Sequence, residues 1–519
     1  MKKSYFNIPV TIAAMAVLSM GVSSCKKSFF DGVPADQYTD GNFYNNATQV
    51  GLATAAMYGK PWFYFNCQYN MGIGDTYAGN SKGDADADMT QFENMSITQS
   101  NGYIYKGWQS MFYVVAVANS VITNVQANAS KLDATTINTA IGEARFMRAA
   151  AYFNLVRLYG AVPIIEDMTK NVSNYQLPRN IVTDVYRFII EDLKYAEANL
   201  PVKGATAARV KIASAKALLA KVYLTQKDYT NAAAKALEVI NNETAYGIGL
   251  MDSYADLFYT KNNNNKESLF ALQWVASNVD GSYGTGNVTQ AYCAAYGQGL
   301  TGLSDGWGSF RPTLDLQSAF ETGDLRRKPT YMLKDDVYPE LKQASGGYTY
   351  PGNNLSTTNA SVKKYVVGTY EDNSSVGGVY FMSTGINTYM IRYSDVLLTY
   401  AEAVLGSNAS TSDVNALKQF NRVRKRAGLG DKSSIGILDI LHERRVEFAF
   451  EGQYWYDLLR LPQAQAISII ANQERGRINS SNVITSLKVT PTAANFVMPI
   501  PQIDLDNDPK LSQDPVPYY

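Results

Sequence analysis

The sequence predicts a mainly α-helical protein in which tetratricopeptide-like helical hairpins form a scaffold, interleaved with a loop-rich half that contains short strands. Two observations predict this fold class. Apolar residues recur at helical spacing over several long segments, mainly within residues 105–250 and 388–461. The segments between them, mainly residues 61–102 and 262–381, are rich in Gly, Asn, Ser, Thr and Tyr. Because the two textures alternate along the chain, we expect one interleaved domain over residues 41–519.

The first residues have the pattern of a bacterial export signal. Two lysines precede the apolar stretch Ile8–Met20, which is too short for a membrane span. The sequence Val22–Cys25 then resembles a lipobox, in which the cysteine becomes the lipidated first residue of the mature protein. We therefore expect a signal peptide over residues 1–24, a lipid anchor on Cys25 and a tether over residues 25–40. An ordinary secretory signal with an incidental cysteine is the alternative.

Three single helices are predicted before the first hairpin. Apolar or small residues at helical spacing define the ranges Asp40–Tyr58, Glu143–Tyr159 and Thr183–Leu200. Gly160 follows the second range and Pro201 ends the third, which is the order expected at helix C-termini.

Two helical hairpins are predicted from stripes of small and apolar residues. The first joins residues 213–224 to residues 233–240 through a turn at Asp228, and the second joins residues 393–404 to residues 417–423. Small residues at close helix contacts are typical of tetratricopeptide repeats. In the loop-rich half, by contrast, only short apolar runs occur.

Two of these short runs, Glu267–Trp274 and Lys363–Val367, predict isolated strands. The loops around them are too long to be simple connections, and long ordered loops commonly carry function.

The segment Ile437–Leu461 is predicted to form one amphipathic helical run with an unusual charge pattern. Glu443, Glu447 and Glu451 fall on one side, where like charges repel each other, so cations must face them. Gly452 is unfavourable inside a helix and indicates close packing or a kink. The cations available for this are Arg422, Arg424, Lys425, Arg426, Arg444, Arg445 and Arg460. We expect such ion pairs to lock neighbouring helices together and to perform no chemistry.

Composition argues against several classes of protein. The chain has 46 basic and 46 acidic residues, which gives no indication of nucleic-acid binding. Its single histidine, His442, argues against multi-histidine metal sites and histidine-based catalytic triads. The sequence contains no nucleophile elbow or phosphate-cradling loop placed between a predicted strand and a predicted helix, as these motifs require. We therefore predict no enzymatic activity and no cofactor.

Two acidic strings and two cysteines leave questions open. The strings Asp84–Asp88 and Asp504–Asp508 carry aspartates at alternate positions, as calcium loops do, but the first lacks the glycine and the final glutamate of such a loop. Solvated acidic loops are the simpler interpretation, and no metal site is predicted.

Cys67 and Cys293 lie far apart in the sequence, so an exported protein could pair them but nothing establishes a disulfide.

The pattern ERR-x-E-x-x-x-EG-x-x-W-x-DL-x-R over Glu443–Arg460 resembles the C-terminal helical motif of the SusD/RagB family of outer-membrane nutrient-binding lipoproteins. The resemblance extends over nearly all of the mature chain. Besides the lipobox and the hairpins, it includes ARFMRAAAYFNLVRLYGAVPII (Ala144–Ile165), GWGSFRPT followed by FETGDLR (Gly306–Arg326), and MPIPQIDLDNDPKLSQDP (Met498–Pro515). The order of these fragments makes the combined signature highly specific.

The resemblance implies a protein anchored through lipidated Cys25 on the outer face of the outer membrane. Its partner would be a SusC-like TonB-dependent transporter barrel, and its ligand an oligosaccharide captured for uptake. Some members of the family serve peptide uptake, so an oligopeptide-binding lipoprotein of the same architecture is the alternative. A tetratricopeptide adaptor for other proteins is a second alternative.

Sugar recognition requires aromatic faces for the C–H patches of the rings and polar groups for their hydroxyls. Three loop clusters combine such residues, and the resemblance places ligand contacts in corresponding loops. The predicted glycan-binding residues are Trp62, Tyr64, Asp75 and Tyr77 in the first cluster, Tyr283, Tyr292 and Tyr296 in the second, and Trp307 in the third. The remaining tryptophans in helical patterns, Trp108 and Trp455, are expected in the core.

Overall fold

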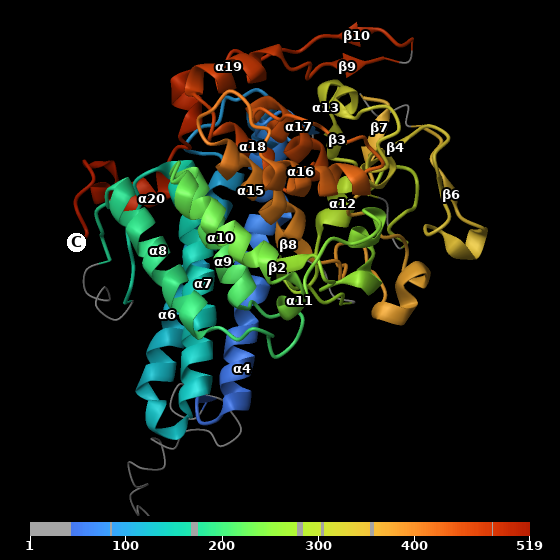
Figure 1. The fold of residues 1–519 in the computed structure, drawn as a ribbon. Coiled ribbons are helices and arrows are strands. Elements are labelled where there is room, and N and C mark those ends of the chain that lie inside the picture. The colour runs from blue at the N-terminus through green and yellow to red at the C-terminus, as the bar shows by residue number, and fades with distance from the viewer. Residues whose placement is uncertain are drawn as a thin grey trace, which may run out of the picture.

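The computed structural model describes residues 43–83, 86–167, 175–277, 284–302, 306–352, 358–479 and 481–519. The lipobox cysteine, Cys25, and the predicted site residue Tyr283 lie outside these ranges. Long antiparallel helices form one side of the molecule, and short helices, turns and small sheets form the other (Figure 1). The predicted mainly helical fold class is confirmed. Within the described residues, no helix is both long and apolar enough to cross a membrane.

The scaffold begins with a row of antiparallel helices. Helix α6 (Gly102–Ala127) packs against α7 (Ala134–Tyr159), and α7 packs against α8 (Val182–Asn199). Helix α7 starts well before the predicted Glu143, because Asp133 caps it by accepting the backbone N–H of Thr136 at 2.9 Å. The first described helix, α4 (Ala47–Ala55), also lies against α7 and falls inside the range predicted for it.

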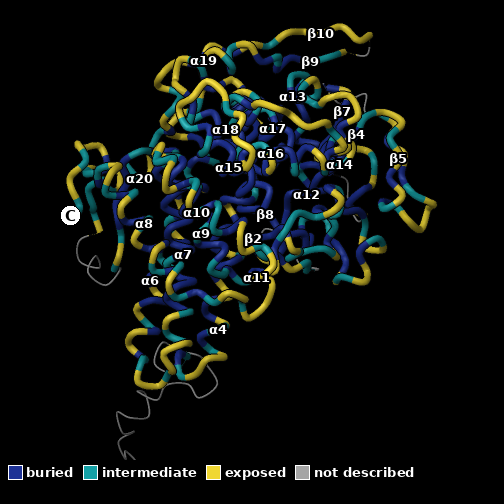
Figure 2. The backbone as a smooth tube through the Cα atoms, viewed as in Figure 1, coloured by how far each residue is buried: buried dark blue, intermediate teal, exposed yellow. Residues whose placement is uncertain are grey.

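Both predicted hairpins are present. The first pairs α9 (Ile212–Thr225) with α10 (Tyr229–Asn241), and Asp228 in the turn caps α10 by accepting the N–H of Asn231 at 3.1 Å. The second pairs α15 (Tyr393–Leu405) with α16 (Val414–Arg426). Almost every residue of α15 is buried, and the helix lies in the middle of the molecule (Figure 2).

The remaining helices are short, and most of them belong to the loop-rich half or to the C-terminal region. They are α5 (Ala87–Glu93), α11 (Glu243–Tyr246), α12 (Thr289–Cys293), α13 (Leu314–Ala319), α14 (Arg327–Thr330), α17 (Ile437–Glu447), α18 (Tyr454–Leu458), α19 (Gln463–Asn472) and α20 (Gln502–Asn507).

The strands form small antiparallel pairs. These are β1 (Ser81–Gly83) with β3 (Phe310–Pro312), β2 (Ser268–Leu272) with β8 (Thr388–Arg392), β4 (Tyr331–Leu333) with β7 (Ala360–Val362), β5 (Val337–Tyr338) with β6 (Tyr348–Thr349), and β9 (Arg477–Ile478) with β10 (Ile484–Thr485). Strand β2 lies within the predicted Glu267–Trp274. It is not isolated, however, because it pairs with β8.

The predicted strand at Lys363–Val367 is wrong, because β7 ends at Val362. The chain turns at this point, where the N–H of Val366 donates to the carbonyl of Lys363 at 2.8 Å. The turn directs the buried ammonium of Lys364 to the carbonyl of Ala449, at 2.6 Å. A buried ammonium group needs hydrogen-bond acceptors, and this need determines the backbone conformation here. The strand propensity of these residues does not.

The predicted single helix over Ile437–Leu461 is also wrong. Helix α17 ends at Glu447, and α18 begins only at Tyr454. Phe450 and Gly452 between them have positive φ values of 65° and 71°, which a helix cannot accommodate. A Cβ atom on Gly452 would lie 2.3 Å from the side chain of Asn70. Close packing and a sharp turn together explain the glycine.

Cations do face the glutamate column, as predicted. Glu443, Glu447 and Glu451 are fully or almost fully buried. Arg424 pairs with Glu443 at 3.0 Å, and Arg426 pairs with Glu447. Three further buried cations, which the sequence analysis did not anticipate, complete the cluster; they are Arg326, Lys364 and Arg392. The other arginines of the motif bind elsewhere, for example Arg444 to Asp395 and Asp457, each at 2.8 Å.

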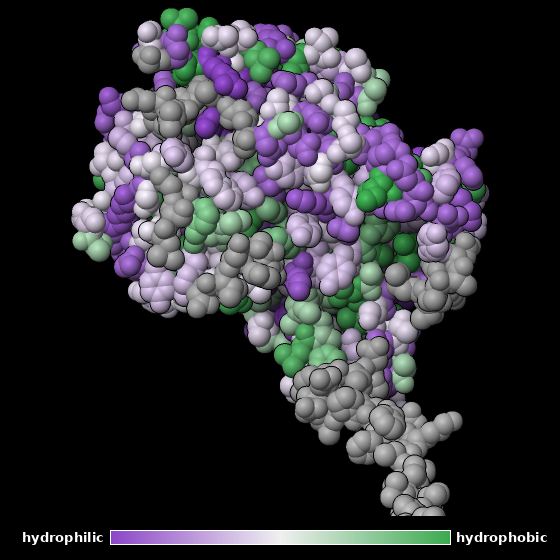
Figure 3. Space-filling model, turned by 180° about the vertical axis from the view of Figure 1, so that it is seen from behind, coloured by the Kyte–Doolittle hydropathy of each residue, from purple (hydrophilic) through white to green (hydrophobic). Residues whose placement is uncertain are grey.

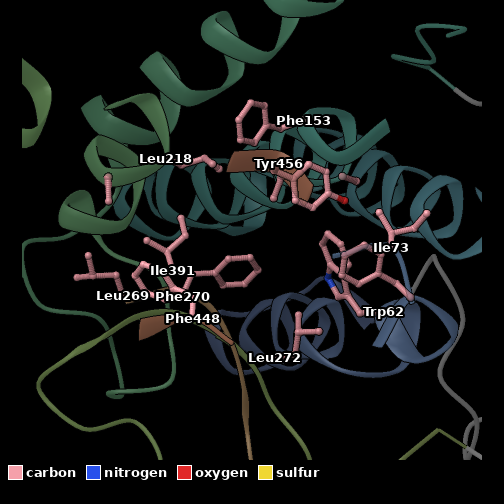
Figure 4. Close-up of a cluster of buried hydrophobic side chains, with 14 of the residues drawn as sticks. Trp62, Ile73, Phe153, Leu218, Leu269, Phe270, Leu272, Ile391, Phe448 and Tyr456 are labelled. Atoms are coloured by element: carbon pink, nitrogen blue, oxygen red, sulfur yellow. The ribbon is translucent and has the colours of Figure 1, made fainter. Parts of the chain in front are cut away.

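A large hydrophobic core joins the helical scaffold to the loop-rich half. Figure 4 shows Phe270 of β2 among Phe153 of α7, Leu218 of α9 and Trp62 of the first loop cluster. The rings of Phe270 and Phe146 lie edge to face, with centroids 5.1 Å apart. The face opposite to that of Figure 1 is mostly polar, with apolar residues in small patches (Figure 3). Because Trp62 of the first loop cluster belongs to the same core as the scaffold helices, the loops that carry the candidate site are anchored on that core.

Candidate functional site

Three of the predicted glycan-binding residues are buried and cannot contact a ligand in this conformation. Trp62 packs edge to face against Phe65, with ring centroids 5.4 Å apart. The ring of Tyr77 packs edge to face against that of Trp455, with centroids 4.7 Å apart. Its hydroxyl donates to the carbonyl of Asn495 at 2.9 Å. Both rings belong to the core, so we remove them from the candidate site.

Asp75 is the third buried residue, and it holds the turn after α17. Its carboxylate accepts the backbone N–H groups of Phe450 and Gly452, both at 2.8 Å, and the side-chain amide of Asn80 at 3.1 Å. Burial raises the pKa of Asp75 to about 6, although these hydrogen bonds oppose the shift. Its role is therefore to connect two distant segments, and it also leaves the candidate site.

The other described candidates lie at the surface. Trp307 is 38% exposed, Tyr296 is 53% exposed and Tyr64 is 44% exposed. Tyr292 is half-buried beneath Trp307. These four residues, unlike the buried three, can present a ring to a ligand.

Trp307, Tyr292 and Phe381 form a group of packed rings. The ring centroids of Trp307 and Tyr292 are 4.7 Å apart with the planes inclined by 54°. Phe381 also packs edge to face against Trp307, with ring centroids 5.2 Å apart. The indole is thus supported by two neighbours and keeps part of its surface open. Such aromatic pairs stabilise a fixed ring orientation by about 0.5–1.5 kcal/mol.

The backbone fixes the position of Trp307. Its N–H donates to the carbonyl of Ala291 at 2.7 Å, and the N–H of Ser309 donates to the carbonyl of Tyr292, also at 2.7 Å. A Cβ on Gly306 would lie 2.3 Å from the carbonyl oxygen of Ala294, so only glycine allows this close approach.

Gly308, on the other side of the indole, has a φ of 56°, and a Cβ there would lie 3.5 Å from the backbone nitrogen of Tyr296. The backbone on both sides of Trp307 therefore packs against residues 294–296, which end at Tyr296. We call Tyr292, Tyr296, Trp307 and Phe381 the aromatic surface.

Polar groups border the aromatic surface. The hydroxyl of Tyr292 lies 3.7 Å from the sulfur of Cys67, and the hydroxyl of Tyr103 donates to the carboxylate of Asp86 at 2.6 Å. The ammonium of Lys106 lies 5.7 Å from the centroid of the Tyr103 ring. Burial is the main cause that raises the pKa of both tyrosines, so their hydroxyls remain protonated donors at neutral pH.

Sequence reasoning missed Tyr103, Lys106 and Phe381. The first two lie in the first turns of α6, whose apolar pattern concealed that its N-terminal end is partly open to solvent. Their spacing of three residues was the available signal, because it places both side chains on one helix face. The prediction that Trp108 of the same helix lies in the core is confirmed, as is that for Trp455.

The two cysteines do not form a disulfide, and aspartates of the first acidic string accept hydrogen bonds from backbone N–H groups. Cys67 and Cys293 are free. Asp86 caps α5 by accepting the N–H of Met89 at 2.8 Å, and Asp88 accepts the N–H of Gly102 at 2.9 Å. Across the described residues, no group of three or more His, Cys, Asp or Glu side chains is placed to hold a metal ion.

Two family models match this chain. Residues 266–519 match the SusD family, and residues 48–224 match a family described as starch-binding and associating with the outer membrane. A SusD-like protein from Bacteroides ovatus is 34% identical, and the match covers 98% of each chain. The starch-binding protein SusD of Bacteroides thetaiotaomicron is 24% identical, with 99% of each chain covered.

Solved structures agree with these matches. A crystal structure with xylogluco-oligosaccharide is similar at a TM-score of 0.83 and 34% identity, covering 91% of this chain and 99% of that one. A laminarin-binding SusD-like protein is similar at a TM-score of 0.71 and 27% identity, covering 90% and 98%. The relatives thus include glycan-binding proteins, and the matches extend over both halves of the molecule. This chain belongs to the SusD family.

Proposed function

We propose that this protein is a cell-surface lipoprotein that captures oligosaccharides and passes them to a SusC-like TonB-dependent transporter in the outer membrane. The observation that carries the proposal is the aromatic surface, in which Trp307 and Tyr296 are exposed on a backbone that hydrogen bonds and glycine contacts hold in place. Grouped exposed aromatic rings mark a binding site more often than scattered ones do. A pre-formed surface also binds at a lower entropic cost.

A neutral oligosaccharide fits the chemistry of this surface. The indole and phenol rings offer flat faces to the C–H groups of a sugar ring, while Asp86, Lys106 and the Tyr292 hydroxyl at the border offer hydrogen bonds to its hydroxyls. Relatives named for xylogluco-oligosaccharide, laminarin and starch support glucose-based polymers as the ligand class.

The proposed location follows from the N-terminal sequence and the family. The lipobox ending at Cys25 supports a lipid anchor, and the family description supports association with the outer membrane. Because binding alone does not move a sugar across a membrane, a transporter must complete the uptake. The family resemblance supports a TonB-dependent barrel as that transporter.

A binding panel on the mature protein tests the ligand class. Xylogluco-oligosaccharides, laminari-oligosaccharides, malto-oligosaccharides and a mixture of short peptides would each be titrated by calorimetry, with tryptophan fluorescence recorded in parallel. We expect saturable binding of at least one glycan. Tight peptide binding without any glycan response would replace this proposal with the oligopeptide alternative, and release of shortened sugars would indicate an enzyme.

A separate experiment tests the partner. The protein would be extracted from outer membranes in a mild detergent and purified with the proteins bound to it. We expect a large barrel protein of the transporter class to copurify. Its repeated absence, while glycan binding persists, would remove transfer from the proposal and leave capture alone.

A further inference from the structure

A second aromatic patch lies beside helix α6. A cavity of about 350 Å³ opens here, and its lining includes Lys60, Pro61, Tyr64, Gln109 and Tyr113. Tyr113 is 49% exposed, which is more than Trp307. Tyr113 is not among the predicted site residues, although it has the same kind of open ring as the aromatic surface.

The floor of this cavity is fixed by hydrogen bonds between α6 and the preceding loop. The Ser110 hydroxyl donates to the carbonyl of Pro61 at 2.6 Å and accepts the N–H of Phe65 at 3.1 Å. Gly284, with a φ of 76°, closes one side, where a Cβ would lie 3.3 Å from the ring of Phe63. The cavity is therefore pre-formed, because a long helix and a buried hydroxyl hold its walls.

Lys106 connects this cavity to the aromatic surface. Its ammonium lies 5.8 Å from the Tyr64 ring centroid in the cavity and 5.7 Å from that of Tyr103. Beyond Tyr103, the turn that contains Cys67 packs on α6, and Cys67 contacts the Tyr292 hydroxyl. The two patches thus form one continuous strip of rings and polar groups.

The strip is long compared with a single sugar ring. Tyr103 and Tyr113 are ten residues apart on α6, which corresponds to about 15 Å at about 1.5 Å per residue. Tyr103, Lys106 and Tyr113 also share one side of the helix, since they fall within about 80° of one another around its axis at about 3.6 residues per turn.

We propose that the cavity lined by Tyr64 and Tyr113 is a second sugar subsite, occupied by the distal residues of the same oligosaccharide that covers the aromatic surface. The proposal rests on the proposed function. Tyr64, Tyr113 and Pro61 supply apolar faces for stacking, while Lys60 and Gln109 supply donors for ring hydroxyls. Long oligosaccharides therefore bind more tightly than short ones, because the second contact is made within an already bound chain.

A length series of oligosaccharides tests this subsite. The probes are xylogluco-oligosaccharides of one repeating unit and of several, or the corresponding laminari-oligosaccharides if the wild-type protein prefers them. The wild type should bind the long probe about tenfold more tightly than the short one. In Tyr113→Ala the short probe should bind as in the wild type, while the long probe loses this tenfold advantage.

Two controls separate stacking from other effects. Tyr113→Phe keeps the ring and should retain the length preference, and Tyr175→Ala removes an exposed tyrosine that lines a different cavity. Equal affinity of Tyr113→Ala and wild type for the long probe would overturn the second subsite but not the proposed function. Equal weakening of the binding of the short and the long probe in Tyr113→Ala would also overturn the second subsite. Failure of the wild type to bind any glycan would overturn both.

Discussion

Trp307 and Tyr292 pack with ring centroids 4.7 Å apart and planes inclined by 54°. The half-buried tyrosine supports the indole from below, so that the exposed part of Trp307 is held in one orientation. Tyr292 belongs to α12, and the loop that carries Trp307 is hydrogen-bonded to the backbone of this helix. The pair therefore needs no rearrangement before a flat ligand can cover it. This is the structural basis of the glycan-capture proposal.

Removal of the indole should abolish most glycan affinity. In Trp307→Ala we expect the dissociation constant for the preferred oligosaccharide to rise at least tenfold, about 1.4 kcal/mol, because the central stacking face is lost. The melting temperature should change little, since the side chain is partly exposed. Calorimetric titration measures the first effect and thermal unfolding the second. Tyr175→Ala is the matched control, and an unchanged dissociation constant in Trp307→Ala would refute the role of this ring.

The ion pairs of the buried cluster should matter for stability and not for ligand affinity. Arg392 donates to Glu447, Glu451 and Glu267 at 2.6–2.8 Å, and all four side chains are buried. Arg392→Met leaves the carboxylates short of positive charge, so we expect the free energy of unfolding to fall by about 3–5 kcal/mol. Denaturant titration provides the measurement.

An exposed ion pair supplies the control for Arg392. Arg187 pairs with Glu191 one helical turn away, and both side chains are about half exposed. Arg187→Met should change the free energy of unfolding far less than Arg392→Met does, because solvent screens the exposed pair. Equal effects of the two substitutions would contradict the view that burial makes the cluster important.

Asp75 should give the protein a characteristic dependence of stability on pH. Burial raises the pKa of its carboxyl from 3.8 to about 6. As the pH rises, the unfolded chain therefore loses this proton before the folded chain does. The contribution of protonated Asp75 to the free energy of unfolding is complete below about pH 4, and it is lost as the pH passes through about 6. A difference of this size corresponds to a loss of the order of 3 kcal/mol.

Asp75→Asn removes this titration. The difference in unfolding free energy between wild type and variant should therefore be most favourable to the wild type near pH 4 and decrease by about 3 kcal/mol towards pH 7. Denaturant titrations of both proteins across this range give the curve. A difference that does not vary with pH would show that Asp75 has the same pKa in the folded and unfolded chains.

The lipid anchor gives a prediction about location. Cys25→Ala removes the only acyl acceptor that a lipobox provides, so the protein should move from the membrane fraction to the soluble exported fraction. Fractionation and labelling with a fatty acid measure this. Binding of the oligosaccharide by the purified variant should be unchanged, and persistent membrane association without label would point to another mode of attachment.

The helical half of the fold was predictable because its periodicity is long and regular. Helix α9 and helix α10 lie within a residue or a few residues of their predicted positions, and Asp228 identified the turn between them. The single helix over Ile437–Leu461 failed for a specific reason. Asp75, some 370 positions earlier in the chain, accepts the N–H groups of Phe450 and Gly452 and stabilises a turn there. No local pattern contains that interaction.

The candidate site was only partly predictable. Trp307 between two glycines was a correct indication of an exposed ring, because the glycines leave space on both sides. Trp62 and Tyr77 were also predicted to lie in loops, but they face the core. Which side of such a segment is buried depends on tertiary packing. Tyr103 and Lys106 were missed because they belong to a helix that otherwise reads as scaffold.

A crystal structure of the protein with its preferred oligosaccharide would show directly whether the aromatic surface captures glycans. We expect a sugar ring stacked on the exposed face of Trp307, with neighbouring residues of the ligand near Tyr296 and along α6 towards Lys106. Electron density for the whole oligosaccharide in the larger cavity between Tyr259 and Tyr338, with Trp307 bare, would contradict it.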